Sequence, residues 1–406
     1  MHSGKRLGRL IFMLLLVAAV VAGCGGGDSD SGGSGSASSG DGSSSAPAPK
    51  SDAFPNPDLT GVPAQEGEAK AKAEAAGKEA AEAAGGATDK LPEGLTVGYL
   101  QIIGGIESAD RVANSTKLAL ESLGYSVLYC DGKGDPQAQV TCGNTLLDKG
   151  AKAIFTNGID SSVISSVLRK AKEKKVPVIA TAGTTPGYDA NFSPSETTQG
   201  ELAVQWLEEQ IGGEAGAKIA VQRYPAPWAK EREDVLDAAI EGGNGIEVAH
   251  EATVDPTKLI DGTKQTVSTW LTQSKDLKAL WFSFDVAGQA GGQQASQAGG
   301  EDGPKVVTFH AEPSTQALIA SGAIDAASDV NYDASSWIAV DQLAEFLARG
   351  KAFDTNVAPE YPGLGNGYTY QVITKDNLPP EGQKYATTEV DVVSYFKAKW
   401  AAEFGR

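Results

Sequence analysis

The chain has 406 residues and a formal net charge of −18, with 52 acidic side chains against 34 Lys and Arg. An acidic surface repels phosphate backbones, so we expect no nucleic-acid partner. Removing an N-terminal leader and a low-complexity tether leaves roughly 310 residues, enough for two lobes of ordinary domain size.

Residues 1–23 have the pattern of a secretory signal peptide. A basic head precedes an uncharged apolar run at 10–21, which is shorter than the ~20 apolar residues of a membrane-spanning helix. Small residues then precede Cys24, and this arrangement resembles the lipobox of bacterial lipoproteins. The resemblance implies cleavage before Cys24, lipidation of its thiol and anchoring to the outer side of the cell membrane. The alternative is an ordinary signal peptide with an incidental cysteine.

Residues 24–90 are predicted to form a low-complexity tether. The part at 25–49 is rich in Gly, Ser and Asp and has too few apolar residues to fold. The part at 64–84 consists mainly of Ala, Glu and Lys, which favours helix but provides no apolar stripe for docking. We therefore expect a solvated helix that lengthens the stalk, with a partner-binding helix as the alternative.

From residue 95 onward, short β-rich runs alternate with amphipathic segments. Strands are expected at 96–101, 126–130, 153–156, 178–181, 218–222, 247–252, 279–284, 305–310 and 324–327. Helices are expected between them, at 109–123, 161–174, 196–210, 229–241, 264–274 and 332–349. Alternation of this kind predicts parallel sheets with helices on both faces.

The pattern divides after 191–194, so the fold class is α/β with two Rossmann-like lobes. We expect an N-terminal lobe from 91–194 plus 331–353 and a C-terminal lobe from 195–330. Residues 354–406 are predicted to be a C-terminal extension that packs on a lobe, with a strand at 368–374 and a helix at 391–404.

Cys130 and Cys142 form an even pair in an exported chain, which predicts a disulfide; two separate buried thiols are the alternative. A loop of this length would stabilise the fold by roughly 3 kcal/mol. A metal site is not expected, because the two cysteines lack partner histidines at usable spacing. We expect no cofactor.

Several local phrases, in the right order, resemble the type I periplasmic binding proteins, the ribose-binding-like receptors of ABC importers. These phrases are Val-Leu-Tyr-Cys-Asp at 127–131, the run at 150–160, Val-Pro-Val-Ile-Ala at 176–180, Lys-Glu-Arg at 230–232 and Phe-Ser-Phe-Asp at 282–285. The resemblance implies two lobes joined by three crossings, near 193–196, 329–331 and 352–355, which close on a ligand.

The sequence also departs from the sugar-binding members of that family. Gly-Gly-Ile-Glu-Ser at 104–108 replaces their aromatic residues after the first strand, and Ala182-Gly183 replaces an Asp-Arg pair. Phe284 and His310 stand where an Asn and an Asp are usual, so only Arg232 remains of the familiar polar contacts. The resemblance therefore implies a sugar as the ligand, but the side chains at these positions do not support that ligand class.

The carboxyl ends of the strands provide the candidate ligand site, since ligands of open α/β sheets bind there. The candidates are Arg232, Trp228, Phe284, His310, Asp285, Glu107, Tyr332 and Asp329. Arg232 is expected to grip a polar group, while Trp228 and Phe284 cover an apolar face. The alternatives are an ion pair of Arg232 with Glu231 or Glu233, a core position for Trp228, a structural His310 and a helix-capping Asp285.

Catalysis has little support, because neither histidine of the mature chain lies in a recognisable nucleophile or metal motif. We expect an extracytoplasmic, monomeric lipoprotein that delivers a small polar ligand, a sugar or a sugar-like molecule, to the permease of an ABC transporter. Two alternatives stay open. One is a ligand-sensing lipoprotein that signals to a membrane kinase or chemoreceptor, and the other is a receptor for an amine, carboxylate or nucleoside.

Overall fold

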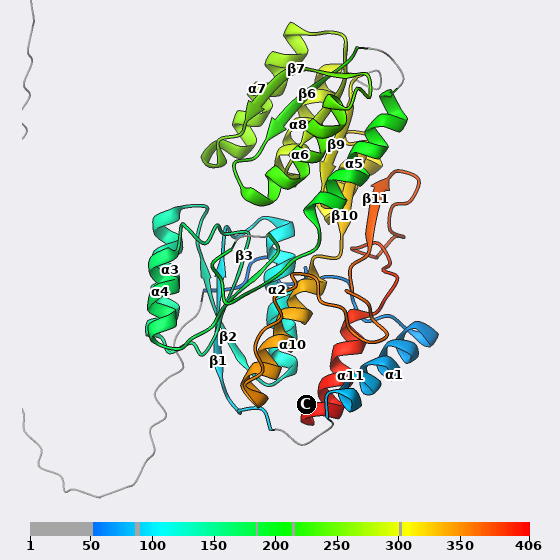
Figure 1. Ribbon diagram of the computed structural model, residues 1–406. Helices are drawn as coiled ribbons and strands as arrows, with labels where there is room; N and C mark the ends of the chain where they lie inside the picture. Colours follow the sequence, from blue (N-terminus) through cyan, green and yellow to red (C-terminus); the bar gives the residue numbers. More distant parts are fainter. Residues whose placement is uncertain (1–51, 86–89, 184–185, 213–215, 300–302) are drawn as a thin grey trace, which may run out of the picture. The chain divides into compact units, whose positions relative to one another are not determined.

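The computed structural model describes residues 52–85, 90–183, 186–212, 216–299 and 303–406 (Figure 1). The predicted signal peptide, Cys24 and residues 25–51 and 86–89 of the predicted tether lie outside these residues. Within the described ranges, no helix has the length and apolar character needed to cross a membrane.

The first sheet has five parallel strands in the order β2-β1-β3-β4-β5. They are β1 (Thr96–Gln101), β2 (Ser126–Asp131), β3 (Ile154–Asn157), β4 (Val178–Thr181) and β5 (Ala190–Phe192). Helices α2 (Glu107–Ser122), α3 (Pro136–Asp148), α4 (Ser165–Glu173) and α10 (Asp333–Arg349) accompany this sheet. Four strands agree with the predicted ones, and the three-residue β5 was not predicted.

Alternate side chains of the first sheet enter different cores. Val97 and Tyr99 pack with residues of α2 and α10, whereas Leu100 packs with residues of α3 and α4. All three side chains are fully buried. This burial on both faces explains why the strands appear in the sequence as nearly continuous apolar runs.

The second sheet has six strands in the order β11-β10-β9-β8-β6-β7, of which β11 alone is antiparallel to its neighbour. They are β6 (Ala217–Arg223), β7 (Ile246–Thr253), β8 (Leu277–Phe282), β9 (Lys305–Phe309), β10 (Ala326–Val330) and β11 (Tyr370–Thr374). The helices are α5 (Glu196–Ile211), α6 (Pro227–Glu241), the short 3₁₀ helix η1 (Pro256–Lys258), α7 (Leu259–Gln273), α8 (Asp285–Gly299) and α9 (Pro313–Ser321).

The expected solvated stalk is wrong for residues 52–85. Helix α1 (Gly67–Ala83) packs along α11 (Val392–Phe404), and Ala73, Gly77 and Ala80 of α1 are buried (Figure 1). The backbones approach so closely that a Cβ at Gly77 would lie 2.3 Å from the carbonyl oxygen of Tyr395. The sequence showed no apolar stripe because this contact is made by small side chains.

The C-terminal extension belongs to both lobes instead of packing on one. Strand β11 pairs with β10 of the second sheet, whereas Trp400 of α11 stacks on Trp337 of α10, with ring centroids 5.5 Å apart. The predicted third crossing at 352–355 is also wrong. Phe353 stacks on Phe346 of α10 at 4.9 Å and holds the chain on the first lobe, so the crossing comes later, just before β11.

A disulfide joins Cys130 at the end of β2 to Cys142 in α3, with the two Cα atoms 5.6 Å apart. The structure therefore contains the bond that the two cysteines predicted. It fixes α3 at the edge of the first sheet.

Candidate ligand-binding site

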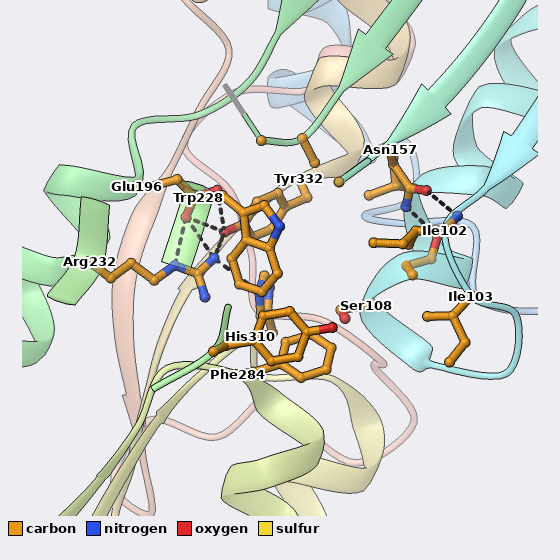
Figure 2. Close-up of a pocket in the computed structure, with 16 residues that line it drawn as sticks. Ile102, Ile103, Ser108, Asn157, Glu196, Trp228, Arg232, Phe284, His310 and Tyr332 are labelled. Carbon is orange, nitrogen blue, oxygen red and sulfur yellow. Dashed lines mark hydrogen bonds and ion pairs between the residues drawn. The ribbon is translucent and has the colours of Figure 1, made fainter. Parts of the chain in front are cut away.

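A cavity of 70 Å³ lies where the carboxyl ends of the two sheets face each other (Figure 2). The first lobe contributes Ile102, Ile103, Ser108, Ala109, Val112, Asn157, Gly158, Ala182 and Gly183 to its lining. The second lobe contributes Tyr224, Trp228, Arg232, Phe284 and His310. Glu196 and Tyr332, which lie at the first two crossings between the lobes, complete it.

Three aromatic rings form the wall of the cavity on the second lobe. The ring centroids of Tyr224 and Trp228 are 5.0 Å apart, and Phe284 lies 4.8 Å from Tyr224 and 5.6 Å from Trp228. Tyr224 follows β6, Trp228 lies in the first turn of α6 and Phe284 follows β8. The loop between Tyr224 and Trp228 contains two prolines, whose fixed φ angles restrict it. We call these three rings the aromatic wall.

On the first lobe, Gly158 and Gly183 lie near the Trp228 ring and have no side chain there. A Cβ at Gly183 would lie 3.2 Å from Cδ1 of Trp228, and one at Gly158 would lie 3.8 Å from its Nε1. Both glycines have positive φ, at +91° and +63°, which side-chain-bearing residues rarely adopt. The Ala182-Gly183 pair thus allows the indole ring to approach the end of β4.

Arg232 is buried and bonded to groups from several elements (Figure 2). Its Nε and Nη2 lie 2.7 and 2.6 Å from one carboxylate oxygen of Glu196, and Nη1 donates to the Ser283 carbonyl at 3.0 Å. Nη2 also donates to the Tyr332 hydroxyl at 2.7 Å and contacts Nε2 of His310 at 3.2 Å. Arg232 is therefore the centre of a buried network, in which Glu196 is its carboxylate partner.

The charges of this network compensate each other. Burial opposes the charge of Arg232, yet the neighbouring carboxylate of Glu196 leaves the Arg232 pKa above its ordinary value. Burial raises the pKa of Glu196, against the opposing effects of Arg232 and the Tyr332 hydroxyl. Burial and the positive charges of Arg232 and Arg111 hold the His310 pKa well below its usual range, so His310 is neutral.

Five of the eight predicted ligand residues line the cavity: Arg232, Trp228, Phe284, His310 and Tyr332. The other three lie outside the described lining. Asp285 is the first residue of α8; its Oδ1 accepts from the Val286 amide at 2.8 Å, and burial raises its pKa to about 6. Glu107 accepts two hydrogen bonds of 2.9 Å from Ser314, and Asp329 accepts one of 3.0 Å from the Ala311 amide.

The candidates named from the sequence did not include Glu196 or Asn157, which both line the cavity. Glu196 begins α5 at a crossing, so its side chain reaches Arg232 of α6 only because α5 and α6 pack together. Asn157 lies at the end of β3, where its side chain bonds the Ala109 carbonyl at 3.3 Å and the Ile102 amide at 3.5 Å. Its position at the end of a strand was the signal that could have identified it.

A second buried ion cluster joins the lobes beside the cavity. Arg111 of α2 lies 3.1 Å from Glu312, 2.7 Å from Asp333 and 3.9 Å from Asp329, and its guanidinium stacks 4.0 Å above the Tyr385 ring. Burial raises the pKa of Glu312 to about 8 despite the charge of Arg111. We call this set the Arg111 cluster.

One group of described acidic residues, Asp341, Glu345 and Glu403, has the spacing of a metal site. Nζ of Lys399 lies among these carboxylates, at 2.8, 3.0 and 2.7 Å from the three residues. The lysine supplies the positive charge that a metal ion would otherwise bring, so this cluster links α10 to α11 and is no cofactor site.

A family model for the periplasmic binding protein domain matches residues 102–352, well over half of the chain. The chain belongs to the periplasmic binding protein family. This periplasmic binding protein is 27% identical over 274 residues to the D-galactose/methyl-galactoside binding periplasmic protein MglB of Haemophilus influenzae, covering 63% of this chain and 82% of that one. It is 23% identical over 214 residues to the ribose import binding protein RbsB of Salmonella typhimurium, covering 51% and 69%.

Among solved structures, an ABC transporter solute binding protein from Mycobacterium smegmatis with bound glycerol is similar, with a TM-score of 0.62. The identity is 19%, and the match covers 72% of this periplasmic binding protein and 99% of the neighbour. The shared architecture of two mostly parallel sheets flanked by helices confirms the predicted fold class.

Proposed function

We propose that this periplasmic binding protein is an extracytoplasmic receptor that delivers a small ligand, a sugar or a sugar-like molecule, to an ABC transporter. The observation that carries the proposal is the cavity, which is lined by side chains from both lobes. A ligand that contacts both lobes favours the conformation in which they meet, because only differential binding shifts such an equilibrium. The names of the ribose and galactose relatives support the sugar class.

Binding without catalysis fits the chemistry of the lining residues. The titratable side chains Arg232, Glu196 and Tyr332 are bonded to one another. His310 is neutral and contacts Arg232 through one ring nitrogen. These groups stabilise each other and leave no activated nucleophile in the described lining.

For the location, we propose that a lipid on Cys24 anchors the mature chain, which we propose to be monomeric. Replacing Cys24 with Ser should release the protein from membranes in cell fractionation. If the Cys24→Ser protein stays with the membrane fraction, the lipid anchor is wrong.

A thermal-shift screen tests the proposed function, because a ligand that binds only the folded protein raises its melting temperature. The panel contains pentoses, hexoses, polyols, nucleosides, amines and carboxylates. Two matched variants locate the binding. Ala109→Leu adds carbon atoms inside the cavity, whereas Ala238→Leu adds the same atoms on an exposed position of α6.

We expect a hit that stabilises the parent and Ala238→Leu but no longer stabilises Ala109→Leu. An absence of any hit would contradict the proposal. A hit that stabilises Ala109→Leu as much as the parent would place the binding outside the cavity and contradict it as well.

A further inference from the structure

The cavity presents no uncompensated charge from its described lining. The Arg232 guanidinium faces the Glu196 carboxylate, the Ser283 carbonyl and the Tyr332 hydroxyl at 3.0 Å or less. Glu196 and Arg232 are both almost completely buried, so neither reaches bulk solvent. A charged ligand would enter a site whose own charges are already paired, and its desolvation would be uncompensated.

Two hydrogen-bond donors in the lining have no partner. Nε1 of Trp228 is buried and unpaired, and so is Nδ1 of His310. Arg232 has only donors, so Nε2 of His310 must accept from it, which puts the ring proton on Nδ1. Both unpaired atoms therefore carry a hydrogen, and they are the donors that this lining offers to an acceptor oxygen or nitrogen of the ligand.

Acceptors for ligand hydroxyl groups are few among the described lining side chains. The Asn157 amide is bonded to two backbone groups, and Oε2 of Glu196 receives bonds from Arg232, Gln199 and Tyr332. Oε1 of Glu196 keeps spare capacity, because its bond from Tyr332 is 3.4 Å long. The hydroxyl groups of Tyr224 and Ser108 add two groups that can accept a hydrogen bond.

The other side chains that line the cavity are apolar. Opposite the aromatic wall lie Ile102, Ile103, Ala109 and Val112 of the first lobe. These side chains enclose a cavity of about 70 Å³. The site thus combines two donors, one carboxylate oxygen with spare capacity and the hydroxyl groups of Tyr224 and Ser108 with flat apolar surfaces.

We infer that the cavity selects a small, uncharged oxygen-bearing compound with few hydroxyl groups, whose acceptor oxygens bind Trp228 and His310. This inference rests on the proposed function and narrows its ligand class. A sugar with many hydroxyl groups would bury hydroxyl hydrogens without acceptors, and each unmade hydrogen bond reduces affinity by about tenfold. Removing hydroxyl groups should therefore strengthen binding, the opposite of what a site built to grip hydroxyls would show.

A series of five-carbon compounds tests the hydroxyl dependence: D-ribose, 2-deoxy-D-ribose and tetrahydrofurfuryl alcohol, with D-ribose 5-phosphate as the charged member. Titration calorimetry on the mature chain should show affinity rising as hydroxyl groups are removed, and no binding of the phosphate. Tightest binding of D-ribose or of its phosphate would overturn the inference while leaving the proposed receptor function intact. Failure of all four to bind would also overturn it, whereas a hit elsewhere in the wider screen would still support the proposed function.

Matched variants test the two donors with the tightest ligand of the series. Trp228→Phe removes the indole N–H and keeps a ring, and Trp337→Phe removes another buried, unpaired indole N–H in the first-lobe core. His310 has φ +62°, which Asn and Asp tolerate, so His310→Asn keeps a donor near Nδ1 and His310→Asp replaces it with an acceptor.

We expect Trp228→Phe and His310→Asp each to lose about tenfold in affinity. Trp337→Phe should stay within about threefold of the parent, less than the loss of one hydrogen bond, and His310→Asn should bind more tightly than His310→Asp because it keeps a donor. Equal affinities of the two His310 variants, or parental affinity of Trp228→Phe, would show that these donors do not face the ligand and would overturn the inference.

Discussion

Arg232 shows how far a single residue could be understood from the sequence. Its place after a strand of a parallel sheet predicted that it would lie at the cavity, and it does. Its ion pair with Glu196 joins residues 36 positions apart, and no local spacing rule covers such a contact. The role expected of Arg232 therefore changes from a direct grip on the ligand to the centre of a buried network.

Arg232→Ala should destabilise the fold, because it leaves Glu196 buried without its partner. Breaking a buried pair of this kind costs about 3–5 kcal/mol, so the free energy of unfolding in urea should fall by that order. Lys230→Ala is the matched control, since Lys230 pairs with Asp234 on the same helix at an exposed position, where the loss should be at most about 1 kcal/mol. An Arg232→Ala protein as stable as the Lys230→Ala control would contradict the network.

Glu312 should make the stability depend on pH. Its pKa is raised to about 8 by burial, although Arg111 opposes the shift, while Asp329 adds to it. The folded state thus holds a proton that the unfolded state releases near the ordinary Glu pKa. The resulting stabilisation is complete below that ordinary value and is lost as the pH rises toward about 8.

Urea unfolding across this pH range checks the prediction with Glu312→Gln as the control. The parent should lose up to about 1.4 kcal/mol per pH unit relative to the variant, which has no carboxylate to titrate. Parallel pH curves for the two proteins would show that Glu312 is ionised throughout.

At the scale of elements, the alternation of β-rich and amphipathic runs predicted most of both sheets, because strands buried on two faces have distinctive sequences. The sequence did not predict β5, whose three residues are too few to show a pattern. It also missed the docking of α1, where the contact surface consists of Ala and Gly, and the late third crossing, which depends on Phe353 stacking on Phe346.

Gly77→Ala tests the docking of α1, because it should change the free energy of unfolding in opposite directions for a docked helix and for a solvated one. In an exposed helix this change stabilises by about 1 kcal/mol, but here the new Cβ would lie 2.3 Å from the carbonyl oxygen of Tyr395. We expect a loss of about 1–3 kcal/mol in the free energy of unfolding, as in other overpacked sites. Gly299→Ala in α8 is the control, since a Cβ there meets nothing within 4 Å. Stabilisation of both variants would mean that α1 is solvated, as the sequence had suggested.

For the whole molecule, the cavity and the Arg111 cluster are made by the same meeting of the two lobes. Glu312 and Ser314 of the second lobe bond Arg111 and Glu107 of α2, and the aromatic wall faces Ile103 across the cavity. The family resemblance predicted two lobes with a ligand between them. The particular residues that connect the lobes could not be predicted, because they depend on how the two sheets face each other.

The central claim is that a small ligand binds in this cavity and contacts both lobes. A crystal structure of the protein with the tightest ligand from the screen tests it most directly. The account predicts one ligand between the aromatic wall and Ile103, within hydrogen-bonding distance of Trp228 or His310. A ligand bound elsewhere, or held by residues of one lobe only, would contradict it.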